Sequence, residues 1–151
     1  SGMGRGSMAI APCGQPAFRA ATVAAIARSA SNGSSVVLAL RNLPMPVIAA
    51  VNGDCAGGGV ELLLATDIRL AAPHARFGLP EVKWSIYPFG GATAKLIQQI
   101  GYVHAMDLLL TGRLIDADTA ARLDLVNEVV RDGPVLDAAL AKARLIAGAT
   151  T

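Results

Sequence analysis

Three consecutive glycines, Gly57–Gly59, stand directly before an apolar run that holds one acid, Glu61, in the stretch CAGGGVELLLATD. The apolar run predicts a helix over 58–66, and the first amides of a helix have no intrahelical acceptor at the positive end of its dipole. Glycine lets a ligand approach such amides because it has no Cβ. The stretch therefore predicts a site for negative charge, with a tight turn packed against a neighbouring strand as the alternative.

Two phosphate-binding motifs are absent from this stretch, which limits the kind of anion that it could bind. No lysine follows the glycines, as a G-x-x-x-x-G-K-[ST] phosphate loop requires, and the G-x-G-x-x-G spacing of a dinucleotide loop is absent. An oxyanion hole remains, in which backbone N–H groups stabilise charge that develops on a carbonyl oxygen. One such donor can contribute about 3 kcal/mol. The glycine run thus favours a transient oxyanion over a phosphate.

Two isolated acids could supply proton transfer. Glu61 lies in the first turn of the predicted helix, where the dipole favours the carboxylate and apolar neighbours raise the cost of its charge. Glu81, in FGLPEVKW, follows a proline that constrains the chain before it. Two carboxyls in different environments could divide acid and base work. The alternatives are that Glu61 complements the dipole on a solvated face and that Glu81 is a solvated loop residue.

The elements that would position these residues follow from periodicity and from Gly, Pro and Asn punctuation. Strands over 47–51 and 67–72 flank the helix 58–66 and predict a parallel βαβ unit. A long proline-punctuated loop, 73–91, follows, and residues 1–17 are interpreted as a loop or a vector remnant. Further helices are expected over 18–29, 35–43, 92–110 with a break at Gly101, 117–123 capped by Asp116, and 134–147, with a strand over 125–130.

Composition limits the class of protein. The 151 residues suffice for one domain, and a content of 53% hydrophobic but only 16% charged residues favours an oligomer or a piece of a larger body. A net charge of +2 without runs of Lys or Arg argues against nucleic acid or anionic membranes as partners. Cys13 and Cys55 lie outside any C-x-x-C pattern, and the apolar runs are shorter than the roughly 18 residues of a membrane span. The absence of a cysteine pair in such a pattern leads us to expect a cytoplasmic protein. His74 and His104 have no carboxylate or thiol at the spacing of metal ligands, so we expect no metal site.

The segment PVIAAVNGDCAGGGVELLLATDIRLAAPHARFGLPEVKWSIYPFGGATAKL, continued by HAMDLLLTGRLIDADTAARLDLVNEVV, resembles the core of the enoyl-CoA hydratase/isomerase, or crotonase, family. The glycine run with its glutamate, F-G-x-P-E, L-L-T-G and L-V-N occur in order, and the resemblance is closest over 46–130. It implies an α/β fold, a crotonase-like spiral of ββα units that is incomplete at both ends. It also implies a homotrimer or hexamer that acts on an acyl thioester of coenzyme A and needs no separate cofactor.

The resemblance assigns roles to individual residues. It implies that the N–H of Gly58 binds the thioester oxygen, that Glu61 activates water and that Glu81 delivers a proton to the α-carbon. Met3, in SGMG, is the candidate for a second oxyanion N–H. The expected substrate-binding residues are Gly57, Gly59, Trp84, Tyr87, Pro88, Phe89 and Gly90.

Several alternatives stay open. The presence of both glutamates favours an enoyl-CoA hydratase. The two alternative functions are a double-bond isomerase and a catalytically silent, truncated module that binds CoA or another subunit. The segment PFGGAT, 88–93, departs from the P-G-A-G-G-T of the family and is expected to alter the acyl pocket beside Glu81. Trp84 and Tyr87 either wall that pocket or serve plain packing, and Lys83 and Lys95 either meet coenzyme phosphates or are solvated.

Overall fold

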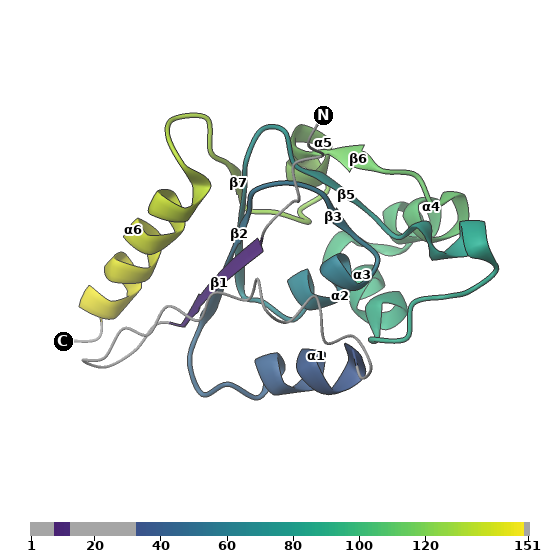
Figure 1. Cartoon of the computed structure of the whole chain (residues 1–151), viewed down its shortest axis with the longest axis horizontal. Coiled ribbons are helices and arrows are strands. Elements are labelled where there is room, and N and C mark those ends of the chain that lie inside the picture. Colours follow the sequence, from purple (N-terminus) through teal and green to yellow (C-terminus); the bar gives the residue numbers. More distant parts are fainter. Residues whose placement is uncertain (1–7, 13–32, 150–151) are drawn as a thin grey trace, which may run out of the picture.

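The computed structural model describes residues 8–12 and 33–149 of the chain. A central sheet carries helix α6 along one face and most of the remaining helices on the other (Figure 1). The elements, in chain order, are β1 (Met8–Pro12), α1 (Gly33–Arg41), β2 (Val47–Val51), β3 (Cys55–Ala56), α2 (Gly58–Leu63), β4 (Ile68–Ala71), β5 (Arg76–Gly78), the 3₁₀ helix η2 (Pro80–Trp84), α3 (Ala92–Ile100), α4 (Tyr102–Thr111), β6 (Ile115–Asp116), α5 (Ala117–Arg122), β7 (Glu128–Val129) and α6 (Val135–Gly148).

The central sheet has the strand order β1-β2-β4-β7. β2 pairs in parallel with β4, with Ile48 opposite Ile68, and α2 connects the two strands in sequence. The predicted βαβ unit is therefore confirmed, and the strand 47–51 has its predicted bounds. The strand predicted over 125–130 is shorter, because only Glu128–Val129 pair with β4.

The continuous apolar character of β2 is explained by burial on both faces. Ile48 and Ala50 belong to the core cluster that includes residues of α6, whereas Ala49 and Val51 belong to the larger cluster on the opposite face. All five residues of the strand are buried. A strand covered on both faces has no need of polar alternation, which is the pattern of an internal parallel strand.

A second sheet, of order β3-β5-β6, stands beside the first. β2 continues into β3 and then α2, and β4 continues into β5 and then η2, so a strand–strand–helix unit occurs twice. The prediction of a loop over 73–91 was wrong at β5 and η2. Local sequence could not reveal β5, because its three residues pair with β3 and β6 from other parts of the chain and its Phe77 is fully buried there.

Two other boundary predictions need correction. Residues 8–12, predicted as part of a loop, form β1, which pairs antiparallel with β2 and places Ala9 opposite Ala50. That partner lies far along the sequence, so a local pattern did not show it. The helix predicted over 58–66 ends at Leu63, because Thr66 turns back and its hydroxyl donates to the Leu63 carbonyl oxygen at 2.7 Å. The predicted helix 18–29 lies outside the described residues.

The helix predicted over 35–43 lies at Gly33–Arg41, and the later helix predictions agree with the caps that the structure shows. Gly101, with φ 83°, separates α3 from α4, and Gly112 ends α4 in the left-handed conformation. The side chain of Asp116 accepts the N–H of Thr119 at 2.7 Å and so begins α5. Pro134 precedes α6. Within the described residues, none of the helices has the length and hydropathy needed to cross a membrane.

Candidate active site

The glycine run forms a sharp entry into α2. Gly57 has φ 57° and ψ −121°, a backbone conformation that residues other than glycine rarely adopt. Its N–H donates to the Gly78 carbonyl oxygen at 2.9 Å, which ties the turn to β5. Gly57 thus has the packing role that a tight turn requires, and this leaves the next residue at the mouth of the helix.

Gly58 begins α2, so its N–H has no intrahelical acceptor. Among the described residues no other acceptor takes this N–H. Gly58 is exposed, and a Cβ placed on it would meet nothing within 4 Å. The free amide and the open space around it are what an oxyanion site needs.

Glu61 points toward the segment that precedes α3. Its Oε1 accepts the N–H of Gly90 at 2.5 Å. A Cβ on Gly90 would lie only 2.7 Å from the Glu61 Oε2, so the close approach requires glycine. Gly90, expected to contact substrate, is therefore also the residue that orients the Glu61 carboxyl.

Glu81 reaches the same turn from η2. A Cβ on Gly57 would lie 3.0 Å from the Glu81 Oε1, so the carboxyl rests against the backbone of the glycine run. Its other oxygen, Oε2, is buried and has no hydrogen-bond partner among the described residues. A buried polar atom without a partner is rare in folded proteins and calls for a functional explanation.

The two carboxyls interact electrostatically. Burial raises the pKa of Glu61, the N–H of Gly90 partly opposes that rise, and the charge of Glu81 adds to it. The two glutamates, separated in sequence, therefore share one electrostatic environment around Gly57 and Gly58. A carboxyl with a raised pKa is a better base near neutral pH than an ordinary one.

Other predicted site residues lie on the exposed surface next to this cluster. Trp84, Tyr87 and Phe89 expose 66%, 60% and 70% of their surface, and the Tyr87 and Phe89 rings contact each other with centroids 4.9 Å apart. Pro88 is buried. Met3 lies outside the described residues.

Comparisons with known proteins decide the family. The family model described as enoyl-CoA hydratase/isomerase matches residues 17–151. The chain belongs to the enoyl-CoA hydratase/isomerase family. The resemblance predicted from the glycine run, F-G-x-P-E and L-L-T-G is thereby confirmed.

Individual members of the family agree with this result. The chain is 48% identical over 116 residues to the enoyl-CoA hydratase EchA19 of Mycobacterium tuberculosis (strain ATCC 25618 / H37Rv), a match that covers 75% of this chain and 44% of that protein. The crystal structure of enoyl-CoA hydratase from Bacillus anthracis is 39% identical, with a TM-score of 0.75 and coverage of 82% and 48%. DspI from Pseudomonas aeruginosa is 36% identical, with a TM-score of 0.74 and coverage of 87% and 49%.

These similarities confirm the predicted crotonase-like α/β fold with an incomplete core. The chain spans slightly less than half the length of each of the three relatives. The matched region includes both glutamates and the glycine run. No group of three His, Cys, Asp or Glu side chains in the described part of the chain could hold a metal ion.

Sequence reasoning missed two residues that shape the site. Arg69, in the strand 67–72, is buried and 7% exposed, and it binds the end of α2 through the Thr66 carbonyl oxygen at 3.1 Å. The available signal was an arginine among the apolar residues of β4, Ile68–Ala71. Gly112 ends α4, and a Cβ on it would lie 2.9 Å from Val82 Cγ1 in η2. Both residues support the elements that carry the glutamates.

Proposed function

We propose that this chain carries the reaction centre of an enoyl-CoA hydratase, which adds water across the α,β double bond of an enoyl-CoA thioester. One observation carries the proposal: Glu81, whose Oε2 is buried and unpartnered, lies beside the glycine turn, and the next residue, Gly58, has an N–H without an acceptor among the described residues and open space at its Cβ position. Membership of the family and the named hydratases among its relatives support the same reaction. An acid and an oxyanion donor side by side suit addition to a conjugated carbonyl.

In the proposed mechanism the Gly58 N–H donates to the thioester oxygen and stabilises the negative charge that develops there. Glu61, held by the Gly90 N–H, accepts a proton from water while the water oxygen bonds to the β-carbon. The two carboxyls share one proton, and Glu81 holds it in the state that reacts. Glu81 gives this proton to the α-carbon, which restores the thioester carbonyl. Glu61 ends protonated and Glu81 ionised, and one proton passed between them restores the starting state.

The remaining expectations belong to the same proposal. The substrate supplies coenzyme A, so no separate cofactor is required, and Met3 would give the second oxyanion N–H. Exposed aromatic side chains at Trp84, Tyr87 and Phe89 are available to contact the acyl-CoA. We further propose that the protein is a homotrimer or hexamer, that it is located in the cytoplasm and that it acts in fatty acid metabolism. An isomerase that moves a double bond from the 3 to the 2 position is the alternative that the family description also names.

The test is hydration of crotonyl-CoA, followed as loss of the enoyl absorbance. We expect turnover by the wild-type chain and a fall of about 10²- to 10⁴-fold in kcat for Glu61→Gln and for Glu81→Gln. Glu128→Gln is the matched control, because its carboxyl is exposed and paired with Lys142 at 3.6 Å, and it should keep full activity. Full activity in Glu81→Gln would refute the proposed role of that residue.

Two other results would replace the proposal. Isomerisation of a 3-enoyl-CoA that depends on Glu81 but not on Glu61 would identify a double-bond isomerase. Saturable binding of acyl-CoA by a folded wild-type chain without any turnover would identify a silent CoA-binding module. Circular dichroism of each variant separates loss of chemistry from loss of fold.

A further inference from the structure

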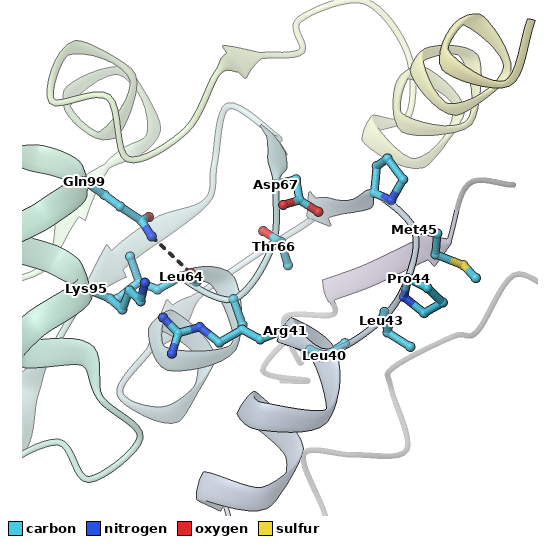
Figure 2. Close-up of a pocket in the computed structure, with 12 residues that line it drawn as sticks. Leu40, Arg41, Leu43, Pro44, Met45, Leu64, Thr66, Asp67, Lys95 and Gln99 are labelled. Carbon is cyan, nitrogen blue, oxygen red and sulfur yellow. Dashed lines mark hydrogen bonds between the residues drawn. The ribbon is translucent and has the colours of Figure 1, made fainter. Parts of the chain in front are cut away.

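A pocket lies at the opposite end of α2 from the glycine turn. It has a volume of about 640 Å³ and opens between the end of α1, the segment before β2 and helix α3 (Figure 2). The lining residues are Leu40, Arg41, Leu43, Pro44, Met45, Pro46, Leu64, Ala65, Thr66, Asp67, Lys95 and Gln99. None of Gly58, Glu61 and Glu81 is among them, so this pocket is separate from the proposed reaction centre.

Two cationic side chains, Arg41 at the end of α1 and Lys95 on α3, line this pocket together (Figure 2). Neither forms an ion pair with a carboxylate among the described residues, where the four ion pairs involve other side chains. The ranges outside the description, 1–7, 13–32 and 150–151, contain no Asp or Glu. No Asp or Glu of the chain therefore neutralises these two cations.

The other polar groups of the pocket already have partners. Asp67 accepts the N–H of Val47 at 2.7 Å, and Figure 2 shows its carboxyl well away from Arg41 and Lys95. Gln99 donates to the Leu64 carbonyl oxygen at 3.1 Å and accepts from a buried arginine at 2.5 Å. The Thr66 hydroxyl donates to a carbonyl oxygen of α2. The two cations are thus the donors left for a ligand.

Seven of the twelve lining residues are apolar, although polar atoms make up the larger part of the exposed lining. Its apolar residues come from α1, the segment before β2 and the end of α2, and they are Leu40, Leu43, Pro44, Met45, Pro46, Leu64 and Ala65. A pocket of several hundred Å³ is in the size range of small-molecule sites. Paired cations beside such a wall are complementary to a ligand with an anionic head and a short apolar tail.

We propose that this pocket binds a small amphipathic anion, with its carboxylate or phosphate monoester head between Arg41 and Lys95 and its hydrocarbon tail against the apolar wall. The cations would provide charge-assisted hydrogen bonds to the head. The tail would cover apolar surface that is otherwise in contact with water. The assignment is independent of the chemistry at the glycine turn, because no residue is shared.

The first experiment titrates the folded chain with octanoate and with octyl phosphate, followed by backbone amide shifts in ¹⁵N-labelled protein. We expect saturable shifts over 40–46, 64–67 and 95–99 with at least one of the two anions, and the one that binds more tightly identifies the head group. Octanol and octylamine carry the same tail with a neutral or cationic head. Equal binding of octanol would show an apolar groove only, and absence of binding by both anions would overturn the proposal.

Variants test the two cations directly. Removal of one charge-assisted contact, in Arg41→Gln or Lys95→Gln, should weaken binding of the anion about tenfold. Lys142→Gln is the matched control, because Lys142 is a lysine of α6 outside the pocket, and it should bind like wild type. Unchanged affinity in both pocket variants would refute the proposal. The hydratase assay on Arg41→Gln should be unaffected by its loss of anion binding, so failure of one proposal leaves the other testable.

Discussion

The polar groups at the two ends of the short helix α2 differ in their hydrogen bonding. At its beginning, Gly57 holds a backbone conformation reserved for glycine, Gly58 keeps a free N–H and Glu81 buries a carboxylate oxygen without a partner. Just after its end, the guanidinium of Arg69 is buried and each of its three nitrogen atoms donates to an acceptor. The beginning of α2 therefore has polar groups without hydrogen-bond partners, whereas the polar groups just after its end are hydrogen-bonded. These two regions are called the unsatisfied end and the saturated end below.

The saturated end shows how a buried charge can be stable. Arg69 donates to the Thr66 hydroxyl at 3.3 Å, the Leu125 carbonyl oxygen at 3.2 Å and the Gln99 Oε1 at 2.5 Å. Burial lowers the pKa of Arg69 to about 10, which still leaves it charged at neutral pH. Gln99 in turn donates to the Leu64 carbonyl oxygen and so fastens the end of α2 to α3. Polar groups without hydrogen-bond partners thus occur at the beginning of α2, where the proposed chemistry takes place. The polar groups around Arg69, which stabilise the fold, have partners.

The largest expected effect comes from breaking the saturated end. Arg69→Met leaves several buried acceptors without a donor and should lower the free energy of unfolding by about 3 kcal/mol or more. Urea denaturation measures the change. Arg122→Met is the control, since that arginine is exposed and donates to Thr119 Oγ1, and it should cost about 0.5 kcal/mol or less. Equal losses in both variants would show that the cluster around Arg69 is not a special source of stability.

An intermediate effect is expected at the unsatisfied end. Gly57→Ala imposes a strained backbone and places a Cβ 3.0 Å from Glu81 Oε1, so we expect a loss of about 2 kcal/mol in unfolding free energy. Gly91→Ala, at φ 83° with nothing within 4 Å of its Cβ, should cost about 1 kcal/mol.

A double mutant sharpens the result for the glycine turn. In the background Glu81→Ala the contact with the new Cβ no longer exists, so Gly57→Ala should cost less than it does in wild type. The same cost in both backgrounds would mean that the Glu81 carboxyl does not rest against the turn. Thermal unfolding of the four proteins gives the comparison.

The smallest effect is the pH dependence of Glu61. Because its pKa is raised above the ordinary value of 4.5, chiefly by burial, the folded state retains a proton that the unfolded state has lost. The contribution of Glu61 to stability therefore falls as pH rises from about 4.5 through the raised pKa. Glu61→Gln stays neutral and should equal wild type below this window and exceed it above, by less than about 1 kcal/mol since the carboxyl is partly exposed.

Urea denaturation at closely spaced pH values checks this difference. Glu128→Gln, at an exposed position, is the control and should not reproduce the step near the pKa of Glu61. A difference between Glu61→Gln and wild type that does not vary with pH would contradict the raised pKa.

The sequence predicted the elements whose signals are local. The break at Gly101, the Asp116 cap and the strand 47–51 depend on neighbouring residues, and all three are confirmed. The strands β1 and β5 were missed, because each is stabilised by hydrogen bonds to distant parts of the chain. Short strands of this kind have little local pattern to recognise.

The same distinction applies to the candidate site. Residue types alone selected Glu61, Glu81 and the glycine run, because acids in apolar surroundings and glycines before a helix are local features. Their mutual arrangement was not readable, nor were the supporting contacts of Gly90 and Gly112. The predicted strand 67–72 gave no role to Arg69, although its side chain donates to the Thr66 carbonyl oxygen after α2 and to Gln99 of α3.

The sequence by itself determined the family and most of the helices, together with the acids and the glycine run that could act together. The tertiary structure alone decided that Glu61 meets Gly90, that Glu81 lies against Gly57 with one oxygen unpaired, and that Arg41 and Lys95 line one pocket. The reason is physical. Capping and periodicity act within a few residues, whereas burial and electrostatic interaction depend on which distant segments the sheet brings together.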